Sequence, residues 1–365
     1  MKKIGIDARL YSQTGVGTYL KNLIYYLEKK ELNNEFYIYL LPEDYKNTYF
    51  KNKNIIKRKV NARWHTFAEQ IGFAIKLYQD NLDLVHFTYF SYPVLYFKKF
   101  VATVHDATPL LFKTGKASTK NQFIYKIKHF FFRIILRCQV SRAMKIITPT
   151  KTVKKQLEDI YGNKISNKTC PIYEGVSYQI LKSKEDKDLS KKFNNFFIYV
   201  GNFYPHKNVE KLLEAFVKVK TNSKLILLGP NDFFSARILH YINIMKWTNK
   251  IILINNPSLP DLIFFYKNAE ALIHPSLSEG FGLPLIEAAN FNCPIIASNI
   301  EVFKELLGEN YLSFDPNDTD NITKKINSFI ENKPKFDYKN IINKYAFEKM
   351  TDETVKIYEE TLYAN

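Results

Sequence analysis

Short apolar runs alternate with longer amphipathic segments along most of this chain of 365 residues. Segments such as 84–87 and 101–104 are rich in apolar side chains and have the length of buried strands. Each is followed by a polar turn and then by residues whose apolar positions recur with helical spacing. Repeated strand–turn–helix units are typical of parallel sheets covered by helices, so the chain is predicted to be an α/β protein.

The pattern falls into two halves. In the first half, strands are predicted at 3–6, 36–41, 54–60, 84–87, 101–104 and 170–173, and helices at 18–29, 64–78, 122–146 and 150–161. In the second half, strands are predicted at 197–200, 224–228, 251–254, 271–273 and 294–297, and helices at 208–216, 232–247, 257–267, 283–290, 335–344 and 348–363. Residues 181–195 are charged and poor in large apolar side chains, so they are predicted to link a domain of residues 1–180 to one of residues 196–349.

The most informative stretch is 272–298, where a buried strand, a glycine-rich turn, a helix and a second strand follow one another. Ligands bind at the carboxyl ends of parallel strands, where this turn lies. Glu279 stands in the turn and Glu287 on the helix. Both could be solvated carboxylates, but Glu287 is flanked by apolar residues, and burying an unpartnered charge is costly.

The same stretch resembles the E-x7-E element of retaining glycosyltransferases of family 4, which typically reads S-x-x-E-G-F-G-L-P-x-x-E-A. Ser276, residues 279–284, Glu287 and Ala288 fit that pattern. The resemblance implies the GT-B fold, in which two Rossmann-like domains face each other across a cleft. It also implies that the last helix, residues 350–365, crosses back to the first domain.

The resemblance further assigns roles to the matched residues. Glu279 would bond the hydroxyls of the donor sugar and act as a catalytic residue, and Glu287 would bond the ribose of the nucleotide. The backbone from Gly280 to Leu283 would complete the donor site, in the order Gly280, Phe281, Gly282 and Leu283. Transfer would retain the anomeric configuration, without a metal ion, another cofactor or an enzyme nucleophile.

A second match lies in the loop after the strand at 197–200. Gly201, Pro205, Lys207 and Asn208 fit the family pattern G-x-x-x-P-x-K-N. Lys207 precedes a helix that Asn208 is expected to cap, so it is suited to bind the diphosphate of the donor, although a loop lysine can also be merely solvated. Asn202 stands where many relatives carry a second cation, and we assign it to the donor site.

The first domain contributes two further candidates. Gly15-Val16-Gly17 precedes a helix, and its backbone amides could approach a phosphate, although an ordinary turn has the same pattern. Gly17 is assigned to the donor site through the resemblance. His105 and Asp106 end the strand at 101–104. The family often has His-Asp there, close to the donor sugar, so His105 is a catalytic candidate; a structural histidine with a capping aspartate is the alternative.

Charge adds a prediction about the membrane. The formal net charge is +17, and residues 107–157 contain 12 Lys or Arg and no Asp or Glu. Aromatic residues are interleaved with these cations. The chain lacks an uninterrupted apolar run of about 20 residues, the length that spans a membrane, and its 3 Cys show no metal or redox spacing. We therefore expect a cytoplasmic protein that binds the anionic inner face of the cytoplasmic membrane, where a lipid-linked saccharide acceptor would lie.

Two other classes of function remain as alternatives. A dinucleotide-dependent oxidoreductase would need G-x-G-x-x-G, but Gly15-Val16-Gly17 is not followed by the third glycine. A nucleic-acid-binding protein would account for the basic segment but leaves the E-x7-E stretch unexplained, so no nucleic-acid partner is expected. Among donors, Asn202 and the P-x-K-N string resemble mannosyltransferases of bacterial surface polysaccharide assembly. GDP-mannose is therefore the predicted donor, and a UDP- or dTDP-sugar is the alternative.

Overall fold

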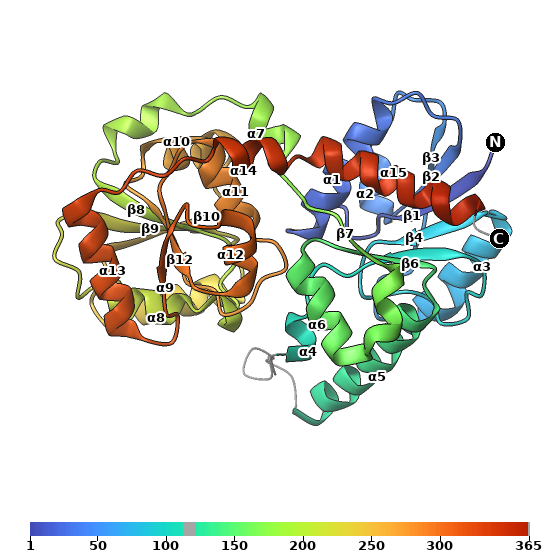
Figure 1. Cartoon of the computed structure of the whole chain (residues 1–365), viewed down its shortest axis with the longest axis horizontal. Helices are drawn as coiled ribbons and strands as arrows, with labels where there is room; N and C mark the ends of the chain where they lie inside the picture. The colour runs from blue at the N-terminus through green and yellow to red at the C-terminus, as the bar shows by residue number, and fades with distance from the viewer. Residues whose placement is uncertain (112–121, 364–365) are drawn as a thin grey trace. The chain divides into compact units, whose positions relative to one another are not determined.

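The computed structural model describes residues 1–111 and 122–363, and these residues form two compact units (Figure 1). The first unit contains residues 1–110, 122–174 and 346–363, and the second contains Gly175–Tyr345. Each unit is built on one parallel sheet with its own hydrophobic core. The prediction of an α/β protein with two domains is confirmed.

The described part of the first unit has a seven-stranded parallel sheet in the order β3-β2-β1-β4-β5-β6-β7. Neighbouring strands bring apolar residues into register, as where Ile4 lies between Phe36 and Leu84. The strands are β1 (Lys3–Asp7), β2 (Glu35–Leu40), β3 (Ile55–Lys59), β4 (Leu84–Phe87), β5 (Phe100–Thr103), β6 (Lys145–Thr148) and β7 (Thr169–Pro171).

Helices cover this sheet, and two of the predicted helices differ from the observed ones. The helix predicted at 64–78 begins later, as a π-helical turn η1 (Glu69–Phe73) that continues into α3 (Ala74–Gln79). The helix predicted at 122–146 ends at Arg142, because Ile146 and Ile147 pair with β5 and belong to strand β6. The other helices are α1 (Val16–Glu28), α2 (Pro42–Asn47), α4 (Thr108–Leu111), α5 (Gln122–Arg142), α6 (Lys151–Tyr161) and η3 (Asn163–Lys168).

The last helix, α15 (Phe347–Tyr363), belongs to the first unit although it follows the second unit in sequence (Figure 1). It packs against α1, β4 and β6. The hydroxyl of Tyr358 lies 2.7 Å from Nδ1 of His86, and Asp352 forms an ion pair with Lys30 on the surface. The expected return of the final helix to the first domain is therefore observed, with the helix starting at 347 rather than 350.

The described second unit contains a six-stranded parallel sheet in the order β10-β9-β8-β11-β12-β13. Its strands are β8 (Phe196–Val200), β9 (Lys224–Gly229), β10 (Ile251–Asn255), β11 (Leu272–His274), β12 (Ile295–Ser298) and β13 (Leu312–Phe314). Its helices are α7 (Tyr178–Lys182), η4 (Lys187–Lys191), η5 (Pro205–Lys207), α8 (Val209–Phe216), α9 (Phe233–Ile244), α10 (Leu259–Asn268), α11 (Leu283–Asn290), α12 (Glu301–Leu307), α13 (Thr319–Asn332) and α14 (Lys339–Lys344).

The segment predicted as a linker, 181–195, is built into the second unit. Its backbone joins α10 through a 3.1 Å hydrogen bond from the amide of Asp186 to the carbonyl of Pro260. The ring of Phe193 packs edge-on against Phe265, with 5.3 Å between the ring centroids. The two units divide earlier, between Glu174 and Gly175. One aromatic side chain thus anchors a segment whose composition otherwise indicates a loop.

Candidate active site

Glu279 is the centre of a hydrogen-bonded cluster at the carboxyl end of β11. Strand β11 ends at His274, and the chain then turns through 275–282 into α11. Oε1 of Glu279 lies 2.6 Å from Nζ of Lys207 and 3.0 Å from Nε2 of His274. It also accepts a 2.8 Å hydrogen bond from the hydroxyl of Ser276. The structure therefore brings together Lys207 and Glu279, which are far apart in sequence.

The charges of this cluster are set by burial and by its members. Burial alone would raise the pKa of Glu279, but the ammonium of Lys207 and the hydrogen bond from His274 outweigh it and hold that pKa well below its usual range. Burial also lowers the pKa of His274, although its hydrogen bond to Glu279 opposes this effect. We therefore assign a carboxylate to Glu279 and a neutral imidazole that donates through Nε2 to His274.

The loop that carries Lys207 is fastened to the loop that carries Glu279. The amide of Leu277 donates to the carbonyl of His206 at 2.8 Å. Asn208 adopts a left-handed conformation with φ of 58°, and its side-chain amide donates to the carbonyls of Pro275 (3.2 Å) and Pro316 (2.8 Å). The prediction that Asn208 caps α8 with its side chain is wrong, because its side-chain amide instead bonds Pro275, in the loop that carries Glu279, and Pro316, in the loop after β13.

Residues 280–282 form the turn into α11. Gly282 has a φ of 94°, a conformation that side chains with a Cβ rarely adopt. Phe281 is buried and packs edge-on against Tyr345, with 5.7 Å between the ring centroids. Since Phe281 points into the protein and Gly280 and Gly282 have no side chain, any donor contact along 280–282 would be made by backbone atoms. Leu283, the first residue of α11, follows the turn.

Glu287 stands outside the Glu279 cluster, on α11. It is buried and accepts a 2.8 Å hydrogen bond from the hydroxyl of Tyr266, whose ring stacks on Phe291. Burial raises the pKa of Glu287 to about 6, and the hydrogen bond from Tyr266 offsets part of that rise. The burial of Glu287, inferred from its apolar neighbours in sequence, is observed.

Three buried polar atoms close to these residues in the chain have no hydrogen-bond partner within the described part of the protein. They are Oδ1 of Asn202, Nδ1 of His206 and Nδ1 of His274. Burial and the neighbouring charge of Lys207 lower the pKa of His206 to about 4, so its ring is neutral at pH 7. Buried polar atoms usually find partners, and these three could bond the hydroxyls or amides of a ligand.

His105 and Asp106, two of the candidate site residues in the first unit, have hydrogen-bond or ring contacts with other residues of that unit. Nε2 of His105 lies 3.0 Å from the carbonyl oxygen of Thr88, and Nδ1 lies 3.3 Å from a carboxylate oxygen of Glu174. Tyr19 packs edge-on against the imidazole, with 4.8 Å between the ring centroids. Asp106 accepts a 2.7 Å hydrogen bond from the amide of Thr108 at the start of α4. The capping aspartate considered as an alternative is thus observed for Asp106.

Gly17 lies inside α1 rather than before it. A Cβ at this position would be 2.6 Å from the carbonyl oxygen of Tyr11 and 3.0 Å from that of Leu10. A side chain would therefore collide with the backbone of the preceding loop. This close approach explains the glycine by packing, and its assignment to the donor site stays a prediction.

Sequence reasoning missed His274 and Tyr266, which hold the two glutamates. His274 ends a buried strand, the same position that identified His105, so the strand-end rule could have found it. Tyr266 lies on α10, where its ring resembles any other buried aromatic residue of the helix. Its hydroxyl contact with Glu287 depends on the packing of α10 against α11 and left no signal in the sequence.

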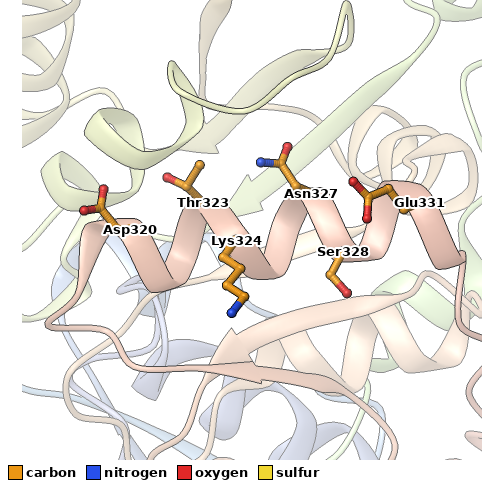
Figure 2. A pocket seen from close by; sticks show the side chains of 6 residues that line it. All are labelled: Asp320, Thr323, Lys324, Asn327, Ser328 and Glu331. Carbon is orange, nitrogen blue, oxygen red and sulfur yellow. The ribbon is translucent and has the colours of Figure 1, made fainter.

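A surface hollow on α13 is unrelated to this cluster. Figure 2 shows that its six lining side chains all come from that helix: Asp320, Thr323, Lys324, Asn327, Ser328 and Glu331. None of them contacts Lys207, Glu279 or Glu287 through a described hydrogen bond or ion pair. Within residues 1–111 and 122–363, no three His, Cys, Asp or Glu side chains gather as metal ligands. None of the described helices has the length and apolar character needed to cross a bilayer.

Each half of the chain matches a known glycosyltransferase family. Residues 13–179 match the family Glycosyltransferase Family 4, and residues 182–349 match the family Glycosyl transferases group 1. The chain is 28% identical over 289 residues to the O-antigen chain mannosyltransferase RfbU of Salmonella typhimurium, a region covering 79% of this chain and 76% of that protein.

Solved structures share the fold over the whole chain. Sucrose-phosphate synthase from Thermosynechococcus elongatus superposes with a TM-score of 0.80 at 15% identity, covering 100% of both chains. Anabaena Alr3699/HepE superposes with a TM-score of 0.76 at 15% identity, covering 99% of this chain and 100% of that one. Together with the parallel sheets of the two units and the two family matches, these likenesses show that the chain is a glycosyltransferase of family 4 with the GT-B fold.

Proposed function

We propose that this glycosyltransferase moves a hexose from a nucleotide sugar to a glycan or lipid-linked saccharide acceptor, with retention of the anomeric configuration. The observation that carries the proposal is the Lys207–Glu279–His274 cluster at the carboxyl edge of the second sheet. It combines a cation, an ionised carboxylate and a neutral imidazole, and it lies where α/β proteins bind their ligands. The cluster is the proposed donor site.

Each member of the site has a proposed role. Lys207 neutralises the charge that grows on the diphosphate as it leaves. Glu279 accepts hydrogen bonds from donor sugar hydroxyls; the hydrogen bonds from Lys207, His274 and Ser276 all reach its Oε1, so its second oxygen, Oε2, is outside them. The carboxylate of Glu287 accepts hydrogen bonds from the ribose. The buried Oδ1 of Asn202 adds an acceptor in the same loop as Lys207.

The chemical step follows from these roles. The bond between the anomeric carbon and the phosphate oxygen breaks, and the acceptor hydroxyl oxygen bonds to the same face of that carbon. The acceptor proton passes to the departing phosphate oxygen, which becomes the product diphosphate. Lys207 and backbone amides supply the positive charge in this account, so a bound metal ion is not required. His105 is proposed to contact the donor sugar from the first domain, and a ligand at its Nδ1 would displace the 3.3 Å contact with Glu174.

The proposed donor is GDP-mannose. Two observations support it: the relative named as an O-antigen chain mannosyltransferase matches over most of both chains, and Asn202 replaces a cation common in the family. The proposed pathway is therefore bacterial surface polysaccharide synthesis, on the cytoplasmic face of the membrane. A UDP-sugar donor is the alternative, because HepE, a structural neighbour, was solved in complex with UDP and glucose.

A thermal-unfolding panel tests the donor. The panel compares GDP-mannose, UDP-glucose, a dTDP-sugar, NAD and a short RNA. All samples contain EDTA, so the same experiment shows whether the ligand binds without a metal ion. A ligand at about 100 times its dissociation constant stabilises the protein by about 2.7 kcal/mol, which is easily measured. We expect stabilisation by GDP-mannose that is lost in Lys207→Ala and kept in the surface variant Lys324→Ala. Stabilisation by UDP-glucose alone would overturn the donor, and stabilisation by NAD or RNA alone would overturn the proposed function.

A further inference from the structure

Helix α5, which is labelled in Figure 1, carries apolar side chains on two faces, and packing against the sheet accounts for only one of them. Its inward face packs into the core of the first unit through Leu136 and Val140, which are 0% and 1% exposed. A second apolar stripe follows at positions i, i+3, i+4 and i+7, which share one helix face. Its members are exposed: Ile127 (43%), Phe130 (62%), Phe131 (56%) and Ile134 (42%). Covering the sheet does not explain this outer stripe.

The cations of this region divide into those with and those without a structural task. Arg142 donates to the carbonyls of Val94 and Tyr96, and Lys145 pairs with Glu360 at 3.8 Å. Arg133 and Arg137 are exposed on α5, and no described acidic side chain lies within ion-pair distance of either. Lys113, Lys116 and Lys120, also counted in the sequence, lie outside the described residues, as do the side chains of Phe123, Tyr125 and Lys128.

The two free arginines line a cavity of about 330 Å³ together with residues of α4 and α6. The other lining residues are Leu110, Ile160 and Tyr161. Burial raises the pKa of Tyr161 to about 12, and both arginines oppose that rise, so the phenol stays protonated and can donate. The nearest acids in sequence, Glu158 and Asp159, do not line the cavity, and Glu158 lies 3.8 Å from Lys154. The cavity therefore offers two guanidinium groups, a phenol and apolar walls.

We propose that this cavity binds the phosphate headgroup of an anionic membrane lipid while the outer stripe of α5 enters the apolar layer. Guanidinium groups match the planar, bidentate geometry of phosphate oxygens, and the phenol adds a donor. Phe130 and Phe131 lie on the same helix as the arginines, two to seven residues away, as expected where a headgroup continues into acyl chains. An anionic lipid also accounts for the absence of Asp and Glu from residues 107–157, because acidic side chains there would repel its headgroup, whereas a neutral partner would not require their absence.

This inference deepens the membrane part of the proposed function, and its test does not depend on sugar transfer. Sedimentation of the full chain is measured with vesicles of phosphatidylcholine alone and with vesicles that also contain about 30 mol% phosphatidylglycerol, an anionic lipid. The charge variant is Arg133→Gln with Arg137→Gln, and the apolar variant is Phe130→Ser with Phe131→Ser. The matched control is Lys51→Gln with Lys53→Gln, which removes two exposed cations before β3, at the opposite edge of the sheet.

Each outcome decides the proposal. The wild type should pellet with anionic vesicles and not with neutral ones. The arginine variant should partition about 30-fold less, because each cation near an anionic surface contributes about 1 kcal/mol. The phenylalanine variant should also partition less, and the control should change less than about threefold. Equal losses in the arginine variant and the control would reduce the effect to bulk charge and overturn the site. Thermal stabilisation by inorganic phosphate that needs both arginines, without vesicle binding, would make the ligand a free phosphate and overturn the lipid.

If nucleotide-sugar stabilisation fails while vesicle binding responds to Arg133 and Arg137, the proposed donor chemistry falls and the lipid site stands. If nucleotide-sugar stabilisation is intact and all variants pellet alike, the lipid site falls alone. Unfolding temperatures of every variant within a few degrees of the wild type show that these exposed substitutions left the fold intact.

Discussion

At the scale of single residues, one carboxylate oxygen joins most of the proposed donor site. Oε1 of Glu279 accepts from Lys207, His274 and Ser276 before any substrate is present. Three donors on one oxygen fix the rotamer of the carboxylate and keep it ionised, so little reorganisation is needed when a sugar binds. Tyr199 stacks on His274, with 5.7 Å between the ring centroids, which in turn fixes the imidazole. Ser276, His274 and Tyr199 thus fix the position of the Glu279 carboxylate, and none of them needs to contact the donor.

Glu287 yields a prediction about pH. Burial raises its pKa from 4.5 to about 6, so over this interval the folded protein binds more protons at Glu287 than the unfolded chain does. The stability contributed by the protonated form is complete below pH 4.5 and is lost as the pH rises through about 6. The loss should be roughly 2 kcal/mol, since one pKa unit corresponds to about 1.4 kcal/mol.

Urea unfolding measures this effect when the wild type and Glu287→Gln are compared between about pH 4 and pH 7. This range brackets the pKa of Glu287 in the unfolded chain and in the folded protein. The amide can still accept from Tyr266 but does not titrate. The difference in unfolding free energy between the two proteins should therefore shift in favour of the variant as the pH rises. A difference that stays flat across the range would show that the pKa of Glu287 is unshifted.

At the scale of elements, the turn between η5 and α8 ties two loops into one site. Asn208 contributes a left-handed backbone and an amide that bonds Pro275 and Pro316. Asn208→Ala should lose about 3 kcal/mol of unfolding free energy: about 1 for each hydrogen bond and about 1 for the left-handed conformation. Asn208→Gly tolerates that conformation and should lose about 2 kcal/mol.

Chemical denaturation of both variants checks the order of these losses. If Asn208→Ala and Asn208→Gly have the same free energy of unfolding, the left-handed backbone conformation carries no energetic cost for alanine. If neither differs from the wild type, the amide does not hold the loops. Both variants should also weaken nucleotide-sugar binding, because the loops they loosen carry Lys207 and Glu279.

Elements with a strong apolar period could be predicted from the sequence, and those defined by tertiary contacts could not. The helix at 283–290 and the strand at 84–87 match the structure at both ends, because glycine, proline or polar residues delimit them. The helix predicted at 122–146 is too long, since Lys145–Thr148 is apolar enough for either a helix or a strand and only its pairing with β5 makes it a strand. Strand β13 is not among the predicted elements because it has only three residues. Helix α13 is also missing from them, although Ile322, Ile326 and Phe329 show the helical spacing that could have identified it.

The candidate site shows the same division. The motifs identified Glu279, Glu287 and Lys207 as candidates, and the structure shows that Lys207 and Glu279 are in contact. Neither motif could show that Asn208 bonds two other loops or that Tyr266 reaches Glu287, because both contacts join residues brought together by packing. The roles assigned to Gly17 and His105 rest on the resemblance, and the structure adds intramolecular partners for both.

At the scale of the whole molecule, the proposed tasks fall on different units. The Lys207–Glu279 cluster belongs to the second unit, and the α5 surface belongs to the first, to which α15 returns. Variants of α5 should therefore change vesicle binding without changing nucleotide affinity, and Lys207→Ala should do the reverse. A net charge of +17 makes the membrane attraction sensitive to salt, whereas the buried Lys207–Glu279 pair is screened much less.

Glu279 is proposed to act on the donor sugar, and the rate of hexose transfer by Glu279→Gln tests this role most directly. The amide keeps the shape of the side chain and removes its charge; Glu331→Gln, at an exposed position on α13, is the matched control. We predict that Glu279→Gln lowers the transfer rate on the order of 100- to 1,000-fold, as when a preorganised polar group is removed from an active site. The control should be unchanged in rate and in unfolding temperature. Because Glu279→Gln leaves the largely buried Lys207 without its carboxylate partner, that variant should unfold at a lower temperature, and its rate is measured at a temperature where circular dichroism shows it folded. A folded Glu279→Gln enzyme that transfers hexose within about threefold of the wild-type rate would contradict this role of Glu279.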